Sequence, residues 1–306
     1  MTNKFQNNND MTNAAPILSS NKFEQLLSLL TFKFFSVKPA VAVLRLEGVI
    51  GKVGAFKTGL TINSLNNLIE KAFKINNLKA LCLVINSPGG APVQAELITN
   101  RIIELAAEKD IPVYSFVEDV AASGGYWLAC AADKIFVSRS SVIGSIGVIA
   151  SGFGFSEAIK KIGVERRIYT QGKNKSILDP FMPEKESDSE IVKKVQKEIH
   201  EHFISVVKER RKGRLTQSDD ILFNGEFWSG QTAIDYGLVD GINNLNSFIK
   251  NKFGDEVKIE YIEPKQSWLK KKFGLGGVYK ELGDNIAAGL IDEVESKIQK
   301  SKFDFF

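Results

Sequence analysis

Serine and lysine, rather than histidine, are the residues with which this sequence could carry out nucleophilic chemistry. The chain has two histidines, His200 and His202, and they lie two residues apart in a charged segment. At that spacing on a helix they point to different faces and cannot both bind one metal ion, so we interpret them as solvent-exposed and predict no metal site. A Ser-His-Asp triad or a Cys-His pair would have to use one of these two residues. A nucleophilic hydrolase here therefore needs another base.

Ser123 lies in a glycine-rich segment that follows a predicted strand and leads into an apolar helix. The segment reads Ala121-Ala122-Ser123-Gly124-Gly125-Tyr126-Trp127. A serine at such a turn can expose its hydroxyl at the end of a sheet, while the N–H of the following glycine faces the same point. The sequence of this segment differs from the G-x-S-x-G motif of a nucleophile elbow. Taken alone, Ser123 would more often be a helix N-cap.

A second glycine-rich segment also joins a predicted strand to a predicted helix. It reads Ile85-Asn86-Ser87-Pro88-Gly89-Gly90-Ala91, and the helix begins near Pro92. Free backbone N–H groups at a helix N-terminus can hold an anion or an oxyanion. Taken alone, a Gly-Gly pair is better explained as a tight turn. It is not a Walker loop, because no Gly-Lys-Ser/Thr follows at the required spacing.

Short apolar runs alternate with amphipathic segments along the middle of the chain. The runs at 41–46, 80–85, 113–117 and 135–137 are typical of buried strands, while helical spacing of apolar residues predicts helices over 62–73, 93–105 and 184–211. Strands alternating with helices indicate βαβ units. The sequence therefore predicts an α/β fold with a mainly parallel sheet.

Composition narrows the class of protein further. Of 306 residues, 43% are hydrophobic and 25% are charged, which is ordinary for a soluble globular protein. The net charge of +4 is too balanced to favour nucleic acid as a partner. Cys82 and Cys130 each lie in an apolar stretch and indicate buried packing. No apolar run reaches the roughly 18 residues of a membrane span. The apolar run at 26–32 lacks the basic region and the small-residue cleavage site of a secretory signal, so we expect none there.

The segments at the two ends differ from the middle of the chain. We expect residues 1–38 to be a mobile or amphipathic N-terminal extension, because the first part is rich in Asn and Thr. Residues 39–250 form the predicted catalytic-type domain. Residues 251–306 form a predicted C-terminal extension. Its basic run Lys270-Lys271-Lys272, flanked by aromatic side chains, is more typical of a solvated helix with one packed face than of a segment for oligomer or peripheral membrane contact, and both interpretations stay open.

Together, the two glycine-rich segments resemble the ClpP/crotonase superfamily, and residues 122–127 resemble the signal peptide peptidase A family in particular. The resemblance continues through residues 142–148, 172–176 and 237–240, and it covers roughly residues 40–245. It implies an α/β, ClpP/crotonase-like fold of repeated ββα units with flanking helices. It also implies a bacterial-type serine endopeptidase in a short, single-domain form that needs no cofactor.

The resemblance assigns a role to each of five residues. Ser123 is the implied nucleophile, and Lys175, about fifty residues further along, is the implied general base. Ser145 would orient the lysine. Backbone N–H groups of Gly124 and Gly90 would form the oxyanion hole, Gly90 being chosen over Gly89. Lys173 is the competitor for the role of base, and the family motif alone separates the two lysines.

A lysine base imposes a physical requirement, because an ordinary lysine has a pKa of about 10.4 and must be desolvated to accept a proton at neutral pH. Lys175 should therefore be buried in the complete site.

Short members of the family assemble into homo-oligomeric rings, and some draw serine and lysine from neighbouring subunits. The resemblance implies short or unfolded apolar peptides as substrates, such as cleaved signal peptides, bound beside a strand. The implied location is cytoplasmic or peripheral on the inner membrane.

Two other functions remain open on the sequence. A crotonase-like enzyme acting on coenzyme A thioesters would use a related fold and backbone N–H donors, but it would not need Ser123 and Lys175. A non-catalytic ring subunit would retain the fold alone. The presence of the serine, the lysine and both glycine turns disfavours this last reading.

Overall fold

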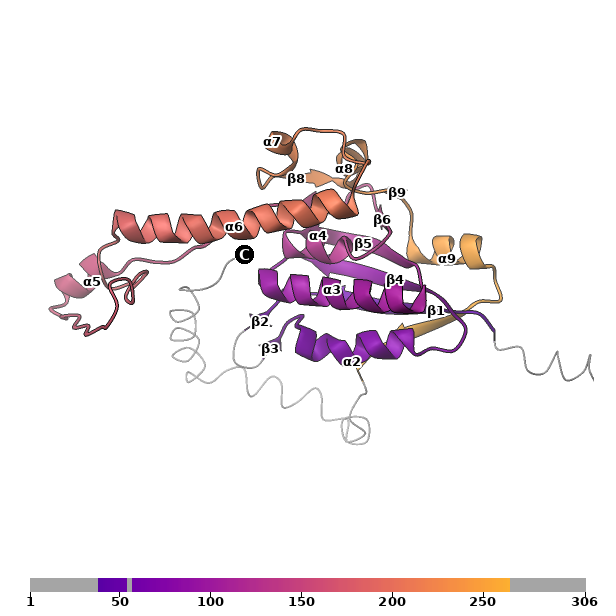
Figure 1. The fold of residues 1–306 in the computed structure, drawn as a ribbon, viewed down its shortest axis with the longest axis horizontal. Helices are drawn as coiled ribbons and strands as arrows, with labels where there is room; N and C mark the ends of the chain where they lie inside the picture. The colour runs from indigo at the N-terminus through magenta and orange to yellow at the C-terminus, as the bar shows by residue number, and fades with distance from the viewer. Residues whose placement is uncertain (1–37, 54–56, 265–306) are drawn as a thin grey trace, which may run out of the picture. The chain divides into compact units, whose positions relative to one another are not determined.

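The computed structural model describes residues 38–53 and 57–264. The predicted N-terminal extension, apart from residue 38, and residues 265–306 of the predicted C-terminal extension lie outside the described residues. The described chain forms a sheet of eight strands, with six in the order β10-β1-β4-β5-β6-β9 (Figure 1). Their bounds are Lys258–Ile262, Ala40–Glu47, Leu78–Ser87, Val113–Ala122, Lys134–Val137 and Gly241–Ile242.

Every pair along this path is parallel. The central strand β5 pairs with β6 along its first half and with β7, Val142–Gly144, along its last three residues. Strand β8, Phe227–Ser229, is antiparallel to β7, and a separate hairpin joins β2, Lys52–Val53, to β3, Lys57–Thr58. Strand β7 therefore lies beside the carboxyl end of β5, where Ser123 follows.

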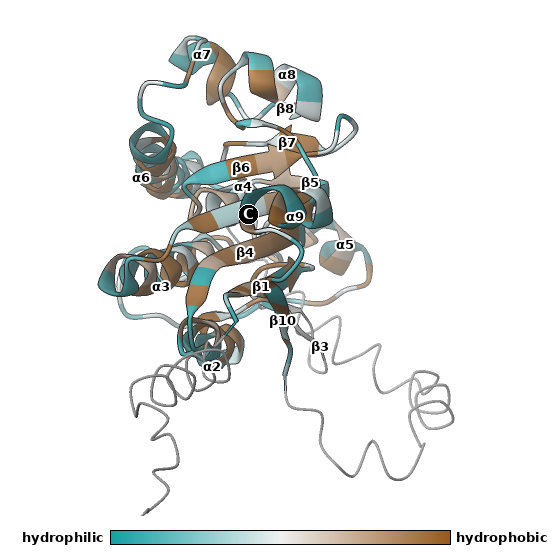
Figure 2. Cartoon of the chain, turned by 90° about the vertical axis from the view of Figure 1, so that its right-hand side faces the viewer, coloured by the Kyte–Doolittle hydropathy of each residue, from teal (hydrophilic) through white to brown (hydrophobic). Residues whose placement is uncertain are grey.

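Helices cover both faces of this sheet, as the view along its edge shows (Figure 2). One face packs against α2, Ile62–Phe73, α3, Pro92–Lys109, and α4, Gly124–Ala129, around buried Leu44, Ile69 and Ile98. The other face packs against α9, Leu245–Phe253, through Ile249. Because both faces of β1 and β4 are covered, residues 40–44 and 80–85 are continuously hydrophobic. The prediction of an α/β fold is confirmed.

The helix boundaries follow from local capping. Thr61 and Ser64 form a capping box at the start of α2, and Pro92 occupies the first turn of α3, where its missing N–H costs nothing. The helix predicted over 62–73 has those bounds, and the one predicted over 184–211 is α6, Glu186–Arg210. The remaining described helices are α5, Ser156–Lys161, α7, Asp219–Leu222, and α8, Gly230–Asp235.

Both cysteines are free and buried in this core, as their apolar surroundings predicted. Burial raises the pKa of the Cys82 thiol to about 12 and that of the Cys130 thiol to about 11. The neutral thiols therefore pack as small apolar groups. Within the described ranges, no helix combines the length and the apolar character that crossing a membrane requires.

Residues 147–185, which we call the arm, connect β7 to α6 and include α5 (Figure 1). Almost all of these residues are exposed or half-buried. Helix α6 continues this pattern, since its buried residues, Phe203 and Val207, lie in its C-terminal half. The arm is thus the part of the described chain with the least core of its own.

Candidate active site

Ser123 occupies a backbone conformation that serine rarely adopts. It follows the last residue of β5 and precedes α4, with φ of 51° and ψ of −126°. Positive φ is uncommon for a residue with a Cβ atom, and such strain persists only where surrounding contacts enforce it. Those contacts are visible: the Ser123 N–H donates to the carbonyl of Gly144 at 2.8 Å, and its carbonyl accepts from the N–H of Tyr126 at 2.9 Å.

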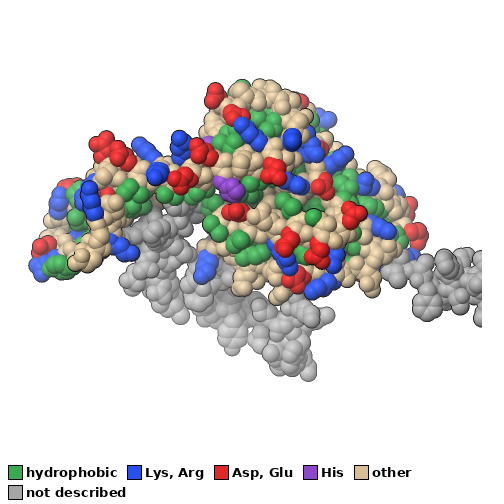
Figure 3. Space-filling view, in the orientation of Figure 1, with side chains coloured by type: hydrophobic (Ala, Val, Ile, Leu, Met, Phe, Trp, Pro, Cys, Tyr) green, Lys and Arg blue, Asp and Glu red, His purple; other side chains and the backbone are tan. Residues whose placement is uncertain are grey.

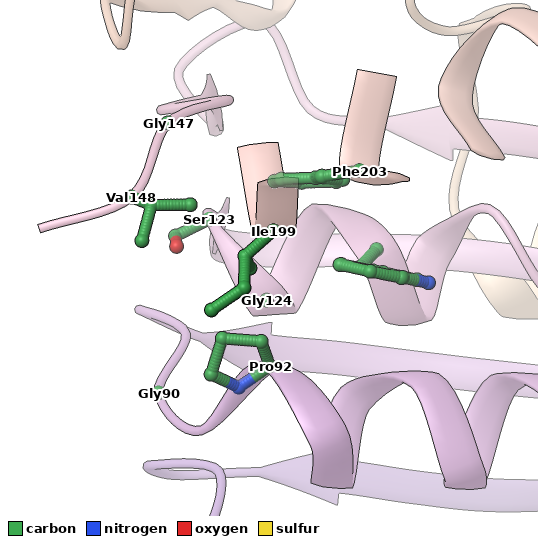
Figure 4. Close-up of a pocket in the computed structure, with 9 residues that line it drawn as sticks. Gly90, Pro92, Ser123, Gly124, Gly147, Val148, Ile199 and Phe203 are labelled. Carbon is green, nitrogen blue, oxygen red and sulfur yellow. The ribbon is translucent and has the colours of Figure 1, made fainter. Parts of the chain in front are cut away.

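The Ser123 hydroxyl does not act as a helix cap. The residue stands at the N-cap position of α4, yet its side chain makes no capping hydrogen bond. The N-cap interpretation, which the sequence alone favoured for an isolated serine, is therefore wrong. The half-buried side chain instead lies at a small pocket (Figure 4). The conformation is that of a serine presented at the end of a sheet.

Two backbone N–H groups lie beside this serine without protein acceptors among the described residues. Gly124 is the first residue of α4, so its N–H has no partner within the helix. The Ile50 N–H donates to the Gly89 carbonyl at 2.8 Å, and the Ala91 N–H donates to the Ile50 carbonyl at 2.9 Å. The Gly90 N–H between them has no acceptor among the described residues. A Cβ atom built on Gly124 would lie 3.5 Å from the Gly90 nitrogen, so the two donors are neighbours.

The Gly89-Gly90 turn is packed directly against the serine turn. A Cβ atom on Gly89 would lie 2.8 Å from Cβ of Ser123, and one on Gly90 would lie 2.1 Å from the carbonyl oxygen of Ile50. The N–H of Gly89 already donates to the Ser87 hydroxyl at 3.2 Å. This favours Gly90 over Gly89 as the free donor. Only glycine fits both positions, which also have φ values of 107° and 141°.

Ser145 comes next to Ser123 through the pairing of β5 with β7. Ala122 is paired with Gly144, so the residues that follow the two strands are neighbours. Ser145 also has a positive φ, 53°, and its N–H donates to the carbonyl of Glu226 at 2.6 Å. Its side chain is half-buried and makes no hydrogen bond to a described residue. The hydroxyl is thus available to an incoming polar group.

The pocket at Ser123 has mostly apolar walls (Figure 4). Helix α6 contributes Ile199 and Phe203, and the loop after Ser145 contributes Val148. The remaining lining residues are Gly90, Pro92, Ser123, Gly124, Trp127 and Gly147. The walls are therefore mostly hydrocarbon, and Gly90 and Gly124, which carry the two free N–H groups, are among the lining residues.

The histidines lie close to this region but do not contact Ser123. His202 is exposed, as predicted, and pairs with Glu96 at 3.2 Å. The interpretation of His200 as solvent-exposed is wrong: it is half-buried, and its Nε2 lies 3.1 Å from the Ile146 carbonyl in the loop after Ser145. The apolar residue Ile199, which precedes His200 and lines the pocket, indicates that this part of α6 faces the rest of the domain. The charged residues around His200 obscured that signal.

The structure does not bring either candidate lysine to the serine. Lys175 and Lys173 are exposed in the arm, and neither contributes to the lining of the pocket. Lys175 lies in a turn in which its N–H donates to the Gly172 carbonyl at 3.1 Å. The single chain therefore assembles Ser123, Ser145, Gly90 and Gly124, and it leaves the fifth predicted residue apart from them.

A larger groove lies elsewhere in the described chain and contains none of the predicted site residues. Its lining includes Arg45, Glu118, Phe116, Leu245 and Tyr261. Arg45 contacts both carboxylate oxygens of Glu118, at 2.6 and 2.8 Å. These charges satisfy one another, and the serines of this groove, Ser64 and Ser138, lack the positive φ of Ser123. The pocket at Ser123 is therefore the better candidate for the chemistry.

Comparison with known proteins identifies the family to which the chain is similar. The model of peptidase family S49 matches residues 106–258. A Methanocaldococcus jannaschii protein with the name "Putative protease MJ0651" is 31% identical over 73% of this chain and 71% of its own length. A Brucella melitensis biotype 1 protein with the name "Na(+)/H(+) antiporter NhaA" is 49% identical over 82% of this chain. The chain spans about a third, 34%, of that relative's length.

Similarity to solved structures is weaker. Two structures of the 1510-N membrane-bound stomatin-specific protease align with TM-scores of 0.48 and 0.47, at 18% and 19% identity. They cover 75% and 77% of this chain, and 100% and 96% of their own.

Proposed function

The chain belongs to peptidase family S49, and on that premise we propose that it is a serine endopeptidase with Ser123 as nucleophile and Lys175 as general base. The observation that carries this proposal is the strained turn at Ser123, with φ of 51°, beside the free N–H groups of Gly90 and Gly124. A serine used only for packing would not need this strain.

The proposed reaction begins with attack of the Ser123 hydroxyl oxygen on a peptide carbonyl carbon. The hydroxyl proton passes to the neutral amine of Lys175, and the carbonyl oxygen becomes an oxyanion that accepts hydrogen bonds from Gly90 and Gly124. The tetrahedral intermediate collapses to an acyl-enzyme, and the leaving amine takes the proton from the lysine. Water, deprotonated by the same lysine, then hydrolyses the ester and restores the serine.

The proposed base needs a covering surface that residues 38–53 and 57–264 do not provide. Desolvation is what makes a lysine neutral near pH 7, whereas Lys175 is exposed in the arm. We propose that a second copy of the chain covers it, so that the lysine of one copy serves the serine of the next. Ser145, beside Ser123, would then hydrogen-bond the incoming amine and orient it.

Exposed apolar side chains support such self-association. In the arm, Tyr169, Phe153 and Ile162 are 92%, 80% and 74% exposed, and Figure 3 shows hydrophobic side chains on the arm's surface among charged ones. On α3, beside the pocket, Val93 is 60% exposed. Apolar groups gathered in this way mark interaction surfaces. Because the arm and α3 are different surfaces, their contact would be head-to-tail, which closes into a ring when the rotation allows.

The apolar pocket indicates the class of substrate. Ile199, Phe203 and Val148 would receive an apolar side chain next to the cleaved bond. An extended peptide can be held mainly by main-chain hydrogen bonds, which suits short or unfolded segments. We therefore propose apolar peptides such as cleaved signal peptides as substrates.

The test is hydrolysis of a fluorogenic apolar peptide by the full chain and three variants. Ser123→Ala and Lys175→Ala should each lower kcat by at least about 10⁴-fold, since loss of a nucleophile or its base removes the whole covalent route. The matched control, Lys173→Ala, removes a neighbouring exposed lysine and should retain normal turnover. Wild-type rate in Ser123→Ala would refute the mechanism, and loss of activity in Lys173→Ala alone would move the base to that residue.

The pH dependence of the rate provides a second check. A lysine base gives a rate that rises with pH through one ionisation, and desolvation places that ionisation well below the ordinary lysine value of about 10.4. A rate that does not change between acidic and alkaline pH would contradict a lysine base.

A further inference from the structure

Asp179 is the one buried residue in the arm, and it carries a charge. Its side chain is 2% exposed, while every other residue from 147 to 185 is half-buried or exposed. A carboxylate is costly to remove from water unless it is paired and hydrogen-bonded. Its position four residues after Lys175 therefore requires an explanation.

Partners from two parts of the arm satisfy this carboxylate. Oδ2 accepts a hydrogen bond from the Arg166 guanidinium at 3.2 Å, and Oδ1 accepts one from the Phe181 N–H at 2.9 Å. The guanidinium of Arg166 also lies over the Phe181 ring, 5.6 Å from its centroid. We call Arg166, Asp179 and Phe181 the brace. It ties the segment after α5 to the segment that enters α6.

A third segment of the arm joins the brace. The Phe155 N–H donates to the Pro180 carbonyl at 2.5 Å, and the rings of Phe155 and Phe181 lie 5.8 Å apart. The brace thus contacts the chain on both sides of α5. It supplies a local anchor in a region that has almost no core.

The segment between Lys175 and the brace is short and tightly turned. Residues 172–178, which we call the lysine loop, contain the Lys175-to-Gly172 hydrogen bond and one from the Ile177 N–H to the Asn174 carbonyl at 3.4 Å. Leu178, directly before Asp179, has φ of 59°. A leucine keeps such a conformation only where its neighbours enforce it. Asp179 is the fixed point on its C-terminal side.

From these contacts we propose that Arg166 and Asp179 are positioning residues that fix the lysine loop and thereby set where Lys175 reaches the site. This inference rests on the proposed function for its consequence in catalysis. A base must meet the serine hydroxyl within hydrogen-bond distance, and a displacement of about 1 Å can cost about 100-fold in rate. The long lysine side chain adds its own freedom, so the loop that carries it has to be held.

The first experiment follows hydrogen exchange of the lysine loop in wild type and Arg166→Gln. Removing the guanidinium leaves the buried carboxylate unpaired, so amides of residues 173–178 should exchange at least about tenfold faster. Arg167→Gln is the matched control, because Arg167 is 70% exposed and pairs with equally exposed Glu165. Unchanged exchange in Arg166→Gln overturns the proposal, whatever the activity of the protein.

The second experiment separates positioning from a general structural role. In Arg166→Gln and Asp179→Asn, kcat should fall about 10- to 100-fold while KM for the peptide changes little, since the pocket at Ser123 is untouched. Arg166→Lys keeps the charge and should recover most of the kcat. Equal loss in Arg166→Gln and Arg167→Gln, or a change confined to KM, would contradict the role.

Lys175→Ala, assayed beside these variants, distinguishes this proposal from the proposed function. Normal turnover in Lys175→Ala would refute the base assignment, and hydrogen exchange would then still decide whether the brace fixes the loop. Loss of turnover in Lys175→Ala together with wild-type kcat in both brace variants would refute the brace and leave the dyad standing.

Discussion

The turn that carries Ser123 and the arm that carries Lys175 are held in place by different means. Around Ser123, buried strands, two glycines without room for a side chain and hydrogen bonds to the next strand hold the backbone at a positive φ. Around Lys175, the chain has one buried residue, Asp179, and many exposed apolar side chains. The first region is complete within one chain. In the proposed mechanism, the second requires another surface to exclude water.

This difference shows how the proposed activity could depend on assembly. A nucleophile and an oxyanion hole must be rigid, because donors act best when they are already aimed at the developing charge. A lysine base must be shielded from water, because desolvation is what keeps its amine neutral. If a second copy of the chain provides that shielding, a separate monomer has an aligned serine but no working base. The predictions below test this contrast, beginning with the largest expected effect.

Of the variants that test this contrast, Gly90→Ala should have the largest effect. Its Cβ atom would lie 2.1 Å from the Ile50 carbonyl oxygen, so the turn must shift and the Gly90 N–H with it. Loss of one oxyanion donor typically lowers kcat by about 100- to 1000-fold. Gly163→Ala is the matched change in the arm: φ is also positive there, 72°, and nothing lies within 4 Å. It should lower the free energy of unfolding by about 1 kcal/mol, the usual penalty for a Cβ atom at positive φ, and leave kcat unchanged. Equal loss of kcat in both variants would contradict the contrast.

Replacing an isoleucine by alanine should lower the free energy of unfolding much more in the core than in the arm. Ile98 in α3 is fully buried, and Ile98→Ala should lower the free energy of unfolding by about 2–5 kcal/mol. Ile162 in the arm is 74% exposed, and Ile162→Ala should change it by less than about 0.5 kcal/mol when the protein is dilute enough to be monomeric. Denaturant unfolding measures both. A larger loss in Ile162→Ala would show that the arm has a core of its own.

At high protein concentration the same arm variant should behave differently. If Ile162 lies in the contact between copies, Ile162→Ala should weaken self-association measured by sedimentation. Ile98→Ala should leave association unchanged in the fraction that is folded. Unaltered association in several arm variants would remove the support that these exposed side chains give to a ring.

Much of the sheet could be predicted from the sequence, because its strands are continuous apolar runs. The runs predicted at 41–46, 80–85, 113–117 and 135–137 lie within β1, β4, β5 and β6. The short strands β7, β8 and β9 have two or three residues each and show no usable periodicity. Of these, β7 matters most, since its pairing with β5 brings Ser145 beside Ser123.

The candidate site was predictable in its residue types but not in its geometry. The glycine turns and the serine are visible as motifs, whereas the positive φ of Ser123 and the missing side-chain cap are not. The pair of Arg166 and Asp179 could not be predicted either, because the two residues are far apart in an exposed segment without periodicity. The separation of Lys175 from the serine likewise has no trace in the sequence, since it depends on how the arm folds.

The most direct test of the shared dyad is to combine Ser123→Ala and Lys175→Ala chains, each inactive alone, in the same assembly. Co-expression with two different tags and sequential purification would isolate particles that contain both chains. If the lysine of one copy serves the serine of the next, random mixing should restore about a quarter of the wild-type rate per particle. At about one contact in four, a chain with an intact lysine then precedes a chain with an intact serine. Mixed particles without activity, in an assay where wild type is active, would contradict a dyad shared between copies.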